Sequence, residues 1–325
     1  MLAIEVKNLT KKFDGVTAVD SVSFSVMEGE IFGLLGPNGA GKTTIINVLT
    51  TLLKPTSGNV TIAGVDIKNS AEVRKNIGIV FQEPALDNKL TGKENLYFHA
   101  IMYGLDKKTR EERTKELLEL VELSDKADVV VEKYSGGMKR RLEIARGLMH
   151  RPKVLFLDEP TLGLDVHTRR KIWKYIEKIK LEENITIVLT THYIEEADFL
   201  CDRVAIINEG KIIVIEKPSK IKQIIGGDVI SVKVADKEIM QFVNELINTG
   251  LVKNFREKNG LIEITVENGE AKLPLIIKIA NKLNLNIDYV SLRKPSLEDA
   301  FLQLTGKKIS GDLNNKDNGK RVWRE

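Results

Sequence analysis

The sequence predicts an α/β domain built on a mostly parallel sheet that is covered by helices on both faces. Short, mostly apolar segments of strand length alternate with helical segments, and these strands are 31–35, 154–157 and 185–189. Apolar strands of this kind are typical of parallel sheets that are buried on both sides. A purely helical stretch near 92–150 interrupts the alternation. We therefore expect a helical subdomain, about 85–150, inserted into a first domain that spans 1–222.

A different pattern begins after Pro218 and the glycine pair at 226–227. The predicted elements then follow the order βαββαβ and end in a short amphipathic helix. That order predicts a small α+β domain with a ferredoxin-like arrangement over 228–305. The last segment, 306–325, is rich in Gly, Asn, Lys and Asp, and we expect it to be a disordered tail.

Composition and charge narrow the class of protein. Lys and Arg number 50 against 46 Asp and Glu, which is too balanced for the clustered basic face of a nucleic-acid-binding protein. Cys201 is the only cysteine, so an internal disulfide is excluded and a reducing, cytosolic setting is favoured. No signal peptide is expected, and no apolar run approaches the roughly 20 residues that span a bilayer. If the protein acts at a membrane, another chain must cross it.

A glycine-rich loop after the first apolar strand carries the strongest chemical signal. Its sequence, Gly-Pro-Asn-Gly-Ala-Gly-Lys-Thr, fits the P-loop pattern. Small residues let backbone N–H groups close around phosphates, and the N-terminus of the next helix adds positive potential. We expect Lys42 to bind the β- and γ-phosphates of ATP, and Thr43 to bind Mg²⁺. The nucleotide-binding residues expected in this loop are Gly36, Pro37, Asn38, Gly39, Ala40, Gly41, Lys42, Thr43 and Thr44.

Two carboxylates follow the apolar strand at 154–157. Asp158 emerges at the carboxyl end of the strand, where open α/β sheets bind ligands, and we expect it to hold Mg²⁺ through water. Glu159 comes next and is placed to orient and polarise the water that attacks the γ-phosphate. A lone glutamate is usually only solvated, so this expectation depends on the Asp-Glu pair directly after the strand.

A second anion site is predicted at 134–138, where the sequence reads Tyr-Ser-Gly-Gly-Met. Ser135 can cap the helix that follows, and Gly136 and Gly137 expose backbone N–H groups at its positive end. On its own this segment is a weak signal, because glycines before helices are common and usually mark a simple cap. Its place shortly before the strand and the Asp-Glu pair strengthens it.

Together these motifs resemble those of the ATP-binding subunits of ABC (ATP-binding cassette) transporters, over about residues 2–220. Kinases, motor proteins and GTPases share the P-loop, but the Ser-Gly-Gly segment resembles the centre of the ABC signature motif. The resemblance implies that Asp165 lies on the loop that lines a dimer seam. It also implies that His192 contacts the γ-phosphate and that Gln82 touches Mg²⁺ and the attacking water.

The resemblance further implies that Phe13 stacks on adenine. The family usually has tyrosine at this position, and stacking needs only the π-face of the ring. A core phenylalanine is the alternative interpretation of Phe13. Residues 228–305 are similar to the C-terminal domain of the daunorubicin-resistance type of transporter ATPase, which shares the ending from Pro295 to Gly306.

The resemblance implies a P-loop NTPase cassette that hydrolyses ATP with Mg²⁺ as a head-to-tail homodimer. ATP would lie between Lys42 of one chain and Ser135 of the other. The expected partner is a separate integral membrane permease, which holds the protein at the cytoplasmic face of the membrane; no nucleic-acid partner is expected. Export of drug-like or lipid-like compounds follows from subfamily likeness alone. The alternatives are a non-transport ABC ATPase that acts on ribosomes or nucleic acid, and a module that binds ATP without hydrolysing it.

Overall fold

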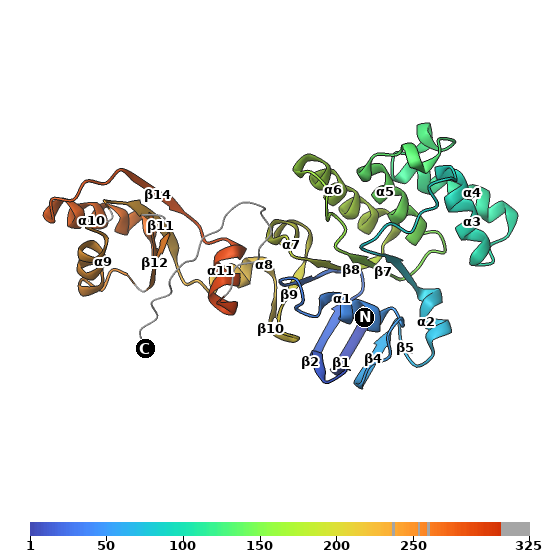
Figure 1. Cartoon of the computed structure of the whole chain (residues 1–325), viewed down its shortest axis with the longest axis horizontal. Coiled ribbons are helices and arrows are strands. Elements are labelled where there is room, and N and C mark those ends of the chain that lie inside the picture. Colours follow the sequence, from blue (N-terminus) through green and yellow to red (C-terminus); the bar gives the residue numbers. More distant parts are fainter. Residues whose placement is uncertain (236–237, 253, 259–260, 307–325) are drawn as a thin grey trace. The chain divides into compact units, whose positions relative to one another are not determined.

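The computed structural model describes residues 1–235, 238–252, 254–258 and 261–306. The chain divides into two compact units, Met1–Pro218 and Ser219–Glu325 (Figure 1). The predicted turn at 259–260 lies outside the described residues, and so does the predicted tail apart from Gly306. Within the described ranges, no helix is both long enough and apolar enough to cross a membrane.

A six-stranded sheet forms the centre of the N-terminal unit, in the order β10-β9-β3-β8-β7-β6. Its strands are β3 (Ile31–Leu35), β6 (Ile77–Val80), β7 (Val154–Asp158), β8 (Thr186–Thr191), β9 (Arg203–Asn208) and β10 (Lys211–Glu216). Neighbouring strands are parallel except β9 and β10, which form an antiparallel hairpin. β3, β7 and β8 are buried along their whole length, which confirms the predicted mostly parallel sheet.

A second sheet of four antiparallel strands has the order β2-β1-β4-β5. Its strands are β1 (Leu2–Phe13), β2 (Val16–Met27), β4 (Ser57–Ile62) and β5 (Val65–Asp66). Apolar and polar residues alternate in parts of these strands, as in half-buried strands, but this pattern does not indicate that they form a sheet of their own. Buried side chains from both sheets and from α1 (Lys42–Leu49) make one continuous core, which includes Ile4, Val26, Phe32, Ile46 and Phe156.

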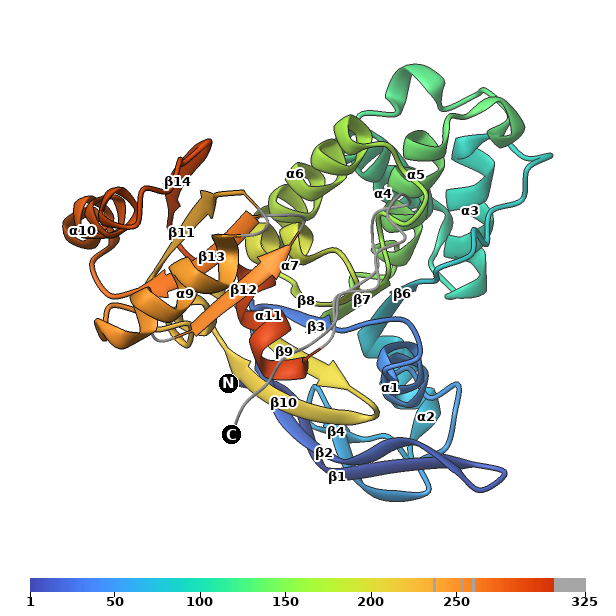
Figure 2. The ribbon, with the colours of Figure 1, turned by 60° about the vertical axis from the view of Figure 1, so that its left-hand side comes forward.

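Helices cover the central sheet on both sides. In Figures 1 and 2, α1 lies on one side of this sheet, and α6 (Val166–Glu183) and α7 (Ile194–Leu200) lie on the other. The remaining helices are α2 (Ser70–Asn76), α3 (Gly92–Met102), α4 (Lys107–Leu120) and α5 (Gly136–Gly147), with single 3-10 turns at Ser124–Lys126 and Val131–Lys133. α3, α4 and α5 pack together as a helical group beyond β6 and β7, drawn in teal and green (Figure 2).

Two helices end just before a residue with a left-handed backbone. The stretch near 92–150, predicted to be purely helical, breaks after Met102. Gly104 has φ 71°, and Asp106 then caps α4 by accepting the Thr109 N–H at 3.1 Å. α1 ends at Leu49, because Thr51 takes a left-handed backbone with φ 63°. Left-handed residues do not continue an α-helix.

The C-terminal unit has the predicted order βαββαβ. Its strands are β11 (Asp228–Lys233), β12 (Asn254–Lys258), β13 (Leu261–Val266) and β14 (Tyr289–Arg293). They pair antiparallel in the order β12-β13-β11-β14. The helices are α9 (Ile239–Asn248), α10 (Gly269–Lys282) and α11 (Leu297–Thr305), and α8 (Pro218–Gln223) lies at the boundary between the units. Phe242, Leu246, Ile276 and Ala280 fill its separate core.

Candidate active site

A pocket of about 300 Å³ lies where the glycine-rich loop joins β3 to α1. Its lining residues are Ala18, Asn38, Gly39, Gly41, Lys42, Thr43, Thr44, Gln82, Glu159 and Leu162. Gly41 must be glycine for two reasons. Its φ is 99°, and a Cβ there would lie 2.5 Å from the carbonyl oxygen of Ala18. The close approach of the loop to β2 therefore fixes the shape of the pocket.

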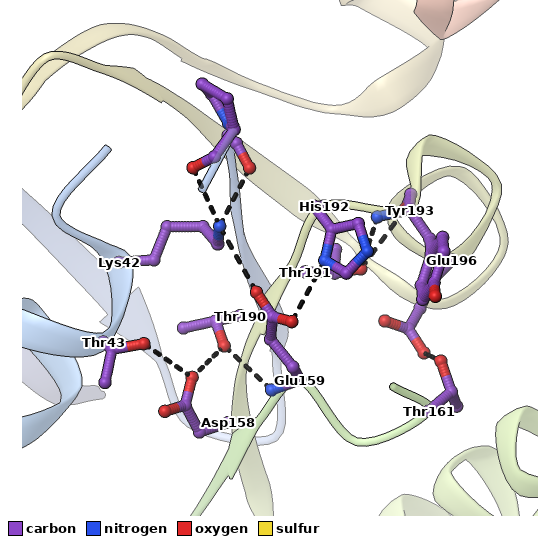
Figure 3. A network of polar contacts seen from close by, with 12 residues as sticks. Lys42, Thr43, Asp158, Glu159, Thr161, Thr190, Thr191, His192, Tyr193 and Glu196 are labelled. Carbon is purple, nitrogen blue, oxygen red and sulfur yellow. Dashed lines mark hydrogen bonds and ion pairs between the residues drawn. The ribbon is translucent and has the colours of Figure 1, made fainter. Parts of the chain in front are cut away.

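The ammonium of Lys42 lies at the centre of this loop (Figure 3). Its Nζ donates hydrogen bonds to the carbonyl oxygens of Gly36 at 2.9 Å and Pro37 at 3.1 Å. The same atom lies 3.4 Å from Oε1 of Glu159. Burial lowers the pKa of Lys42, and the nearby carboxylates of Glu159 and Asp158 act in the opposite direction. The loop thus holds a buried cation at the place where a phosphate chain would enter.

Asp158 gathers hydroxyl groups from two other elements. Thr43 at the start of α1 donates to its Oδ1 at 3.3 Å, and Thr190 on β8 donates to the same oxygen. Burial raises the pKa of Asp158 despite these two hydrogen bonds. The Thr43 hydroxyl and the Asp158 carboxylate are the hard oxygen ligands that Mg²⁺ prefers.

The described residues contain no cluster of three or more His, Cys, Asp or Glu side chains that could hold a metal by itself. Thr43 and Asp158 therefore fit a Mg²⁺ ion that takes its remaining ligands from water and phosphate, which is how nucleotide-bound Mg²⁺ is commonly held.

Glu159 lies between the side chains of Lys42 and His192. Its Oε1 faces Lys42, and its Oε2 lies 3.0 Å from Nδ1 of His192 (Figure 3). Burial acts to raise the pKa of Glu159, but the contacts with His192 and Lys42 outweigh burial and hold the pKa below its ordinary value. Glu159 is thus a buried, ionised carboxylate at neutral pH, which suits a group that orients or polarises water.

The backbone of Glu159 is strained. Its φ is 46°, in the left-handed region that non-glycine residues rarely adopt. Its N–H donates to the Thr190 hydroxyl at 2.9 Å. The hydroxyl of Thr190 therefore binds both acidic residues, Asp158 through the side chain and Glu159 through the backbone.

His192 follows directly on β8 and is almost fully buried. Glu196, four residues further along the chain, reaches the loop that follows Glu159. Glu196 on α7 is fully buried and accepts hydrogen bonds from Thr161 at 2.7 Å and from Trp173 at 2.8 Å. The ends of β7 and β8 are thus tied to each other on both sides of Glu159 (Figure 3).

Comparison with known proteins agrees with this geometry. A family model described as ABC transporter matches residues 19–162, and one described as the C-terminal domain of DrrA1-3-like ATP-binding proteins matches residues 217–305. The linearmycin resistance ATP-binding protein LnrL of Bacillus subtilis is 37% identical over 310 residues, which cover 94% of this chain and 99% of LnrL. This chain belongs to the ABC transporter ATP-binding proteins.

Further relatives of this ABC protein have similar names. The daunorubicin resistance ATP-binding protein DrrA2 of Streptomyces coeruleorubidus is 37% identical and covers 94% of this chain and 95% of its own. The Nod factor export ATP-binding protein I of Sinorhizobium fredii is 38% identical and covers 95% and 87%.

A solved structure supports the activity of this ABC protein. The ATP-binding cassette MJ0796, seen as a dimer in a post-hydrolysis state with ADP and Pi, is 32% identical with a TM-score of 0.59. The match covers 66% of this chain and 98% of MJ0796. This ABC protein binds and hydrolyses ATP.

The structure of this ABC protein brings some of the predicted site residues together. The glycine-rich loop, Lys42, Asp158, Glu159 and His192 form one connected set, and Gln82 lines the same pocket with an exposed side chain.

Other predicted site residues are not among the described residues that line this pocket. Ser135 caps α5 by accepting the Met138 N–H at 3.3 Å, and Gly136 and Gly137 begin that helix. Asp165 caps α6 by accepting the N–H groups of residues 167 and 168, each at 3.0 Å. Phe13 ends β1 with 40% of its surface exposed, and the ammonium of Lys11 lies 4.7 Å from the ring centroid.

Two residues that touch the site have no role in the sequence-based prediction. Thr190 on β8 binds the Asp158 side chain and the Glu159 backbone. Arg140 on α5 reaches the backbone of Asp158, Glu159 and Pro160. Both residues form hydrogen bonds with groups that are distant along the chain, so only the folded structure shows that they contact the site. The one local signal is the spacing of Arg140 and Glu143, three residues apart on a helix.

Proposed function

We propose that two copies of this ABC ATPase bind two ATP molecules between them, head to tail, and drive a separate membrane permease. The observation that carries this proposal is the position of Ser135. It begins a 12-residue helix whose positive end does not line the described pocket of its own chain. In a head-to-tail pair, that end of one chain would cover the triphosphate bound on Lys42 of its partner, which is a two-fold isologous arrangement.

Within each site the roles follow from the side chains. Lys42 binds the β- and γ-phosphates, while Thr43 and Asp158 hold Mg²⁺. When bound, the ion neutralises charge on the phosphate oxygens. Glu159 orients and polarises the attacking water, and His192 holds the Glu159 carboxylate and faces the γ-phosphate. The loop of Gln82 senses the same phosphate. Phe13 supplies a stacking surface for adenine.

The helical group offers a surface for the permease. On α3 and the residue after it, four large apolar or aromatic side chains are exposed, namely Phe98, Ile101, Met102 and Tyr103, by 50%, 42%, 81% and 39%. A cluster of this kind on a protein surface marks an interaction site. Docking of the permease there would hold this chain at the cytoplasmic face of the membrane and connect the permease with the nearby loop of Gln82.

We further propose that the permease exports a drug-like or lipid-like compound. Linearmycin resistance, daunorubicin resistance and Nod factor export appear in the names of the relatives, which align over most of this chain. This inference rests on likeness, since the substrate contacts belong to the permease.

Mixing two inactive variants tests the head-to-tail arrangement. Lys42→Ala removes the phosphate-binding ammonium, and Ser135→Arg blocks the helix end with a bulky side chain. In a head-to-tail heterodimer, one of the two sites takes its Lys42 from the Ser135→Arg chain and its Ser135 from the Lys42→Ala chain, so it is intact. Phosphate release should reappear on mixing. If each chain used its own Ser135, mixing would restore nothing and the proposal would fail.

Purification of the native complex from membranes tests the partner. Co-purification of an integral membrane protein supports the transport proposal. Ribosomes or nucleic acid in its place would favour the non-transport ABC ATPase.

A further inference from the structure

The guanidinium of Arg140 is buried and binds three separate segments of the N-terminal unit. Its Nε donates to the carbonyl oxygen of Pro160 at 2.7 Å, and its Nη2 donates to those of Asp158 at 3.0 Å and Glu159 at 3.2 Å. Its Nη1 donates to the carbonyl oxygen of Phe81 at 2.6 Å and to Oε2 of Glu143 at 3.0 Å. These acceptors number five, one for each N–H of a guanidinium.

Three of these acceptors belong to the strained turn that carries Glu159. A left-handed backbone at a non-glycine residue is strained and persists only where its surroundings hold it. Thr190 holds this turn from the N–H side, and Arg140 holds it through three consecutive carbonyl groups. The direction of the Glu159 side chain therefore depends on Arg140.

The other contacts reach the loop of Gln82. Arg140 holds this loop at Phe81, and Glu143 accepts the Ala85 N–H at 2.8 Å with its Oε1. Arg146, three residues further along α5, donates to the carbonyl oxygen of Ala85. Side chains on one face of α5 thus hold both ends of the loop, while residues 82–84 between them are exposed.

We propose that Arg140 is a positioning residue for ATP hydrolysis. Through one guanidinium it sets the backbone of Glu159 and the loop of Gln82 in a fixed relation to α5, the helix whose N-terminus is Ser135. It acts through these two segments. The inference rests on the proposed role of Glu159.

Lysine cannot replace arginine here. An ammonium has three donors, which cannot reach five acceptors spread around a planar fork, although it keeps the charge that pairs with Glu143. Arg140→Lys should therefore lower kcat about 10- to 100-fold, because small displacements of catalytic groups have effects of that size. The affinity for ATP should change little, since Lys42 and the glycine-rich loop make no contact with Arg140 in the described structure.

The matched control is Arg113→Lys. Arg113 is also buried, pairs with a glutamate, Glu183, and binds a carbonyl oxygen, that of Leu148 at 3.1 Å. It lies on α4, and its hydrogen bonds and ion pairs among the described residues go to Glu116, Leu148 and Glu183, none of which belongs to the site. Arg113→Lys should lower thermal stability about as much as Arg140→Lys and leave kcat close to that of the wild type.

The experiment measures kcat and the equilibrium dissociation constant of ATP for full-length variants, together with hydrogen–deuterium exchange. Faster exchange in peptides over 81–85 and 158–162 is expected for Arg140→Lys alone. A wild-type kcat for Arg140→Lys, or an equal loss of kcat in Arg113→Lys, would overturn the proposal. Glu143→Gln, which keeps an acceptor for the Ala85 N–H, should lower kcat less, and it decides the matter if Arg140→Lys does not fold. A wild-type kcat for Glu143→Gln would then overturn it.

Glu159→Gln tests the proposed role of Glu159 separately from that of Arg140. If it turns over ATP normally, the role of Glu159 is wrong. If it is inactive while Arg140→Lys is fully active, only the positioning role of Arg140 fails.

Discussion

Oε1 of Glu159 lies 3.4 Å from Nζ of Lys42, so the carboxylate proposed to act on water is also a partner of the ammonium proposed to bind phosphate. This contact links the two functions electrostatically. The negative charge of Glu159, so close to Lys42, opposes the binding of another anion. Burial acts to raise the pKa of Glu159, but the contacts with His192 and Lys42 outweigh burial and keep the carboxylate ionised.

Glu159→Gln should therefore lower turnover while leaving ATP affinity unchanged or higher. The amide keeps the shape of the side chain but cannot accept a proton, so we expect kcat to fall about 100-fold or more. Phosphate release and equilibrium ATP binding measure the two effects. Glu83→Gln, an exposed carboxylate next to Gln82, is the control and should behave like the wild type. Weaker ATP binding by Glu159→Gln would contradict the electrostatic link.

Thr190→Val should lower kcat by more than its loss of folding stability can explain. The change leaves the buried Glu159 N–H without its acceptor and removes a donor from Asp158, at a cost of about 1–3 kcal/mol in the free energy of unfolding. It also releases the Glu159 turn, so we expect kcat to fall about 10-fold. Thr186→Val is a close control on the same strand, because the buried Thr186 hydroxyl accepts the Gly29 N–H at 3.0 Å. The free energy of unfolding, from chemical denaturation, and kcat should be measured for both variants; both should be destabilised, but only Thr190→Val should lose kcat. Equal kcat values would argue against a role of Thr190 in holding Glu159.

Phe13→Ala tests the adenine contact. Stacking of a base on an aromatic ring is worth about 1–3 kcal/mol, so ATP should bind roughly 5- to 100-fold more weakly. Inorganic tripolyphosphate, which lacks the base, should bind both proteins equally, and Phe13→Tyr should retain the affinity for ATP. The ring is 40% exposed, so the fold should tolerate these changes. An equal loss of affinity for tripolyphosphate would point to a structural role of Phe13.

The C-terminal unit should lose stability in acid through Asp299. Burial acts to raise the pKa of this carboxyl, but hydrogen bonds from Arg293 and Ser296 outweigh burial and lower the pKa to about 2. Because this pKa is below the ordinary value of 3.8, the unfolded chain binds the proton first. The contribution of Asp299 is thus complete above about pH 4 and is lost as the pH falls towards 2.

Asp299→Asn should destabilise the C-terminal unit at pH 7 by about 1–3 kcal/mol, since it leaves the Arg293 guanidinium poorly paired. The difference from the wild type should shrink at pH 3. This difference in stability is measured by hydrogen–deuterium exchange of peptides from β11 and β13, compared between the wild type and the variant at each pH. Asp288→Asn removes an exposed carboxylate of the same unit and should have no effect. A difference that grows in acid would refute the assigned pKa direction.

Features of this protein that depend on residues adjacent in the chain could be predicted from the sequence alone. The glycine-rich loop and Lys42, the Asp158-Glu159 pair and the βαββαβ order are local patterns. Each follows from the φ angles that glycine allows, or from the periodicity of strands and helices. Their residues could therefore be named without a structure, and so could the family.

Only the tertiary structure decided which distant groups meet. Nothing near Arg140 in the sequence indicates that its guanidinium binds residues 81 and 158–160, or that Thr190 holds Glu159 in a left-handed conformation. The division of the first strands into a separate sheet was equally invisible. The physical reason is that hydrogen bonds and packing are satisfied in three dimensions, by partners that no local pattern specifies.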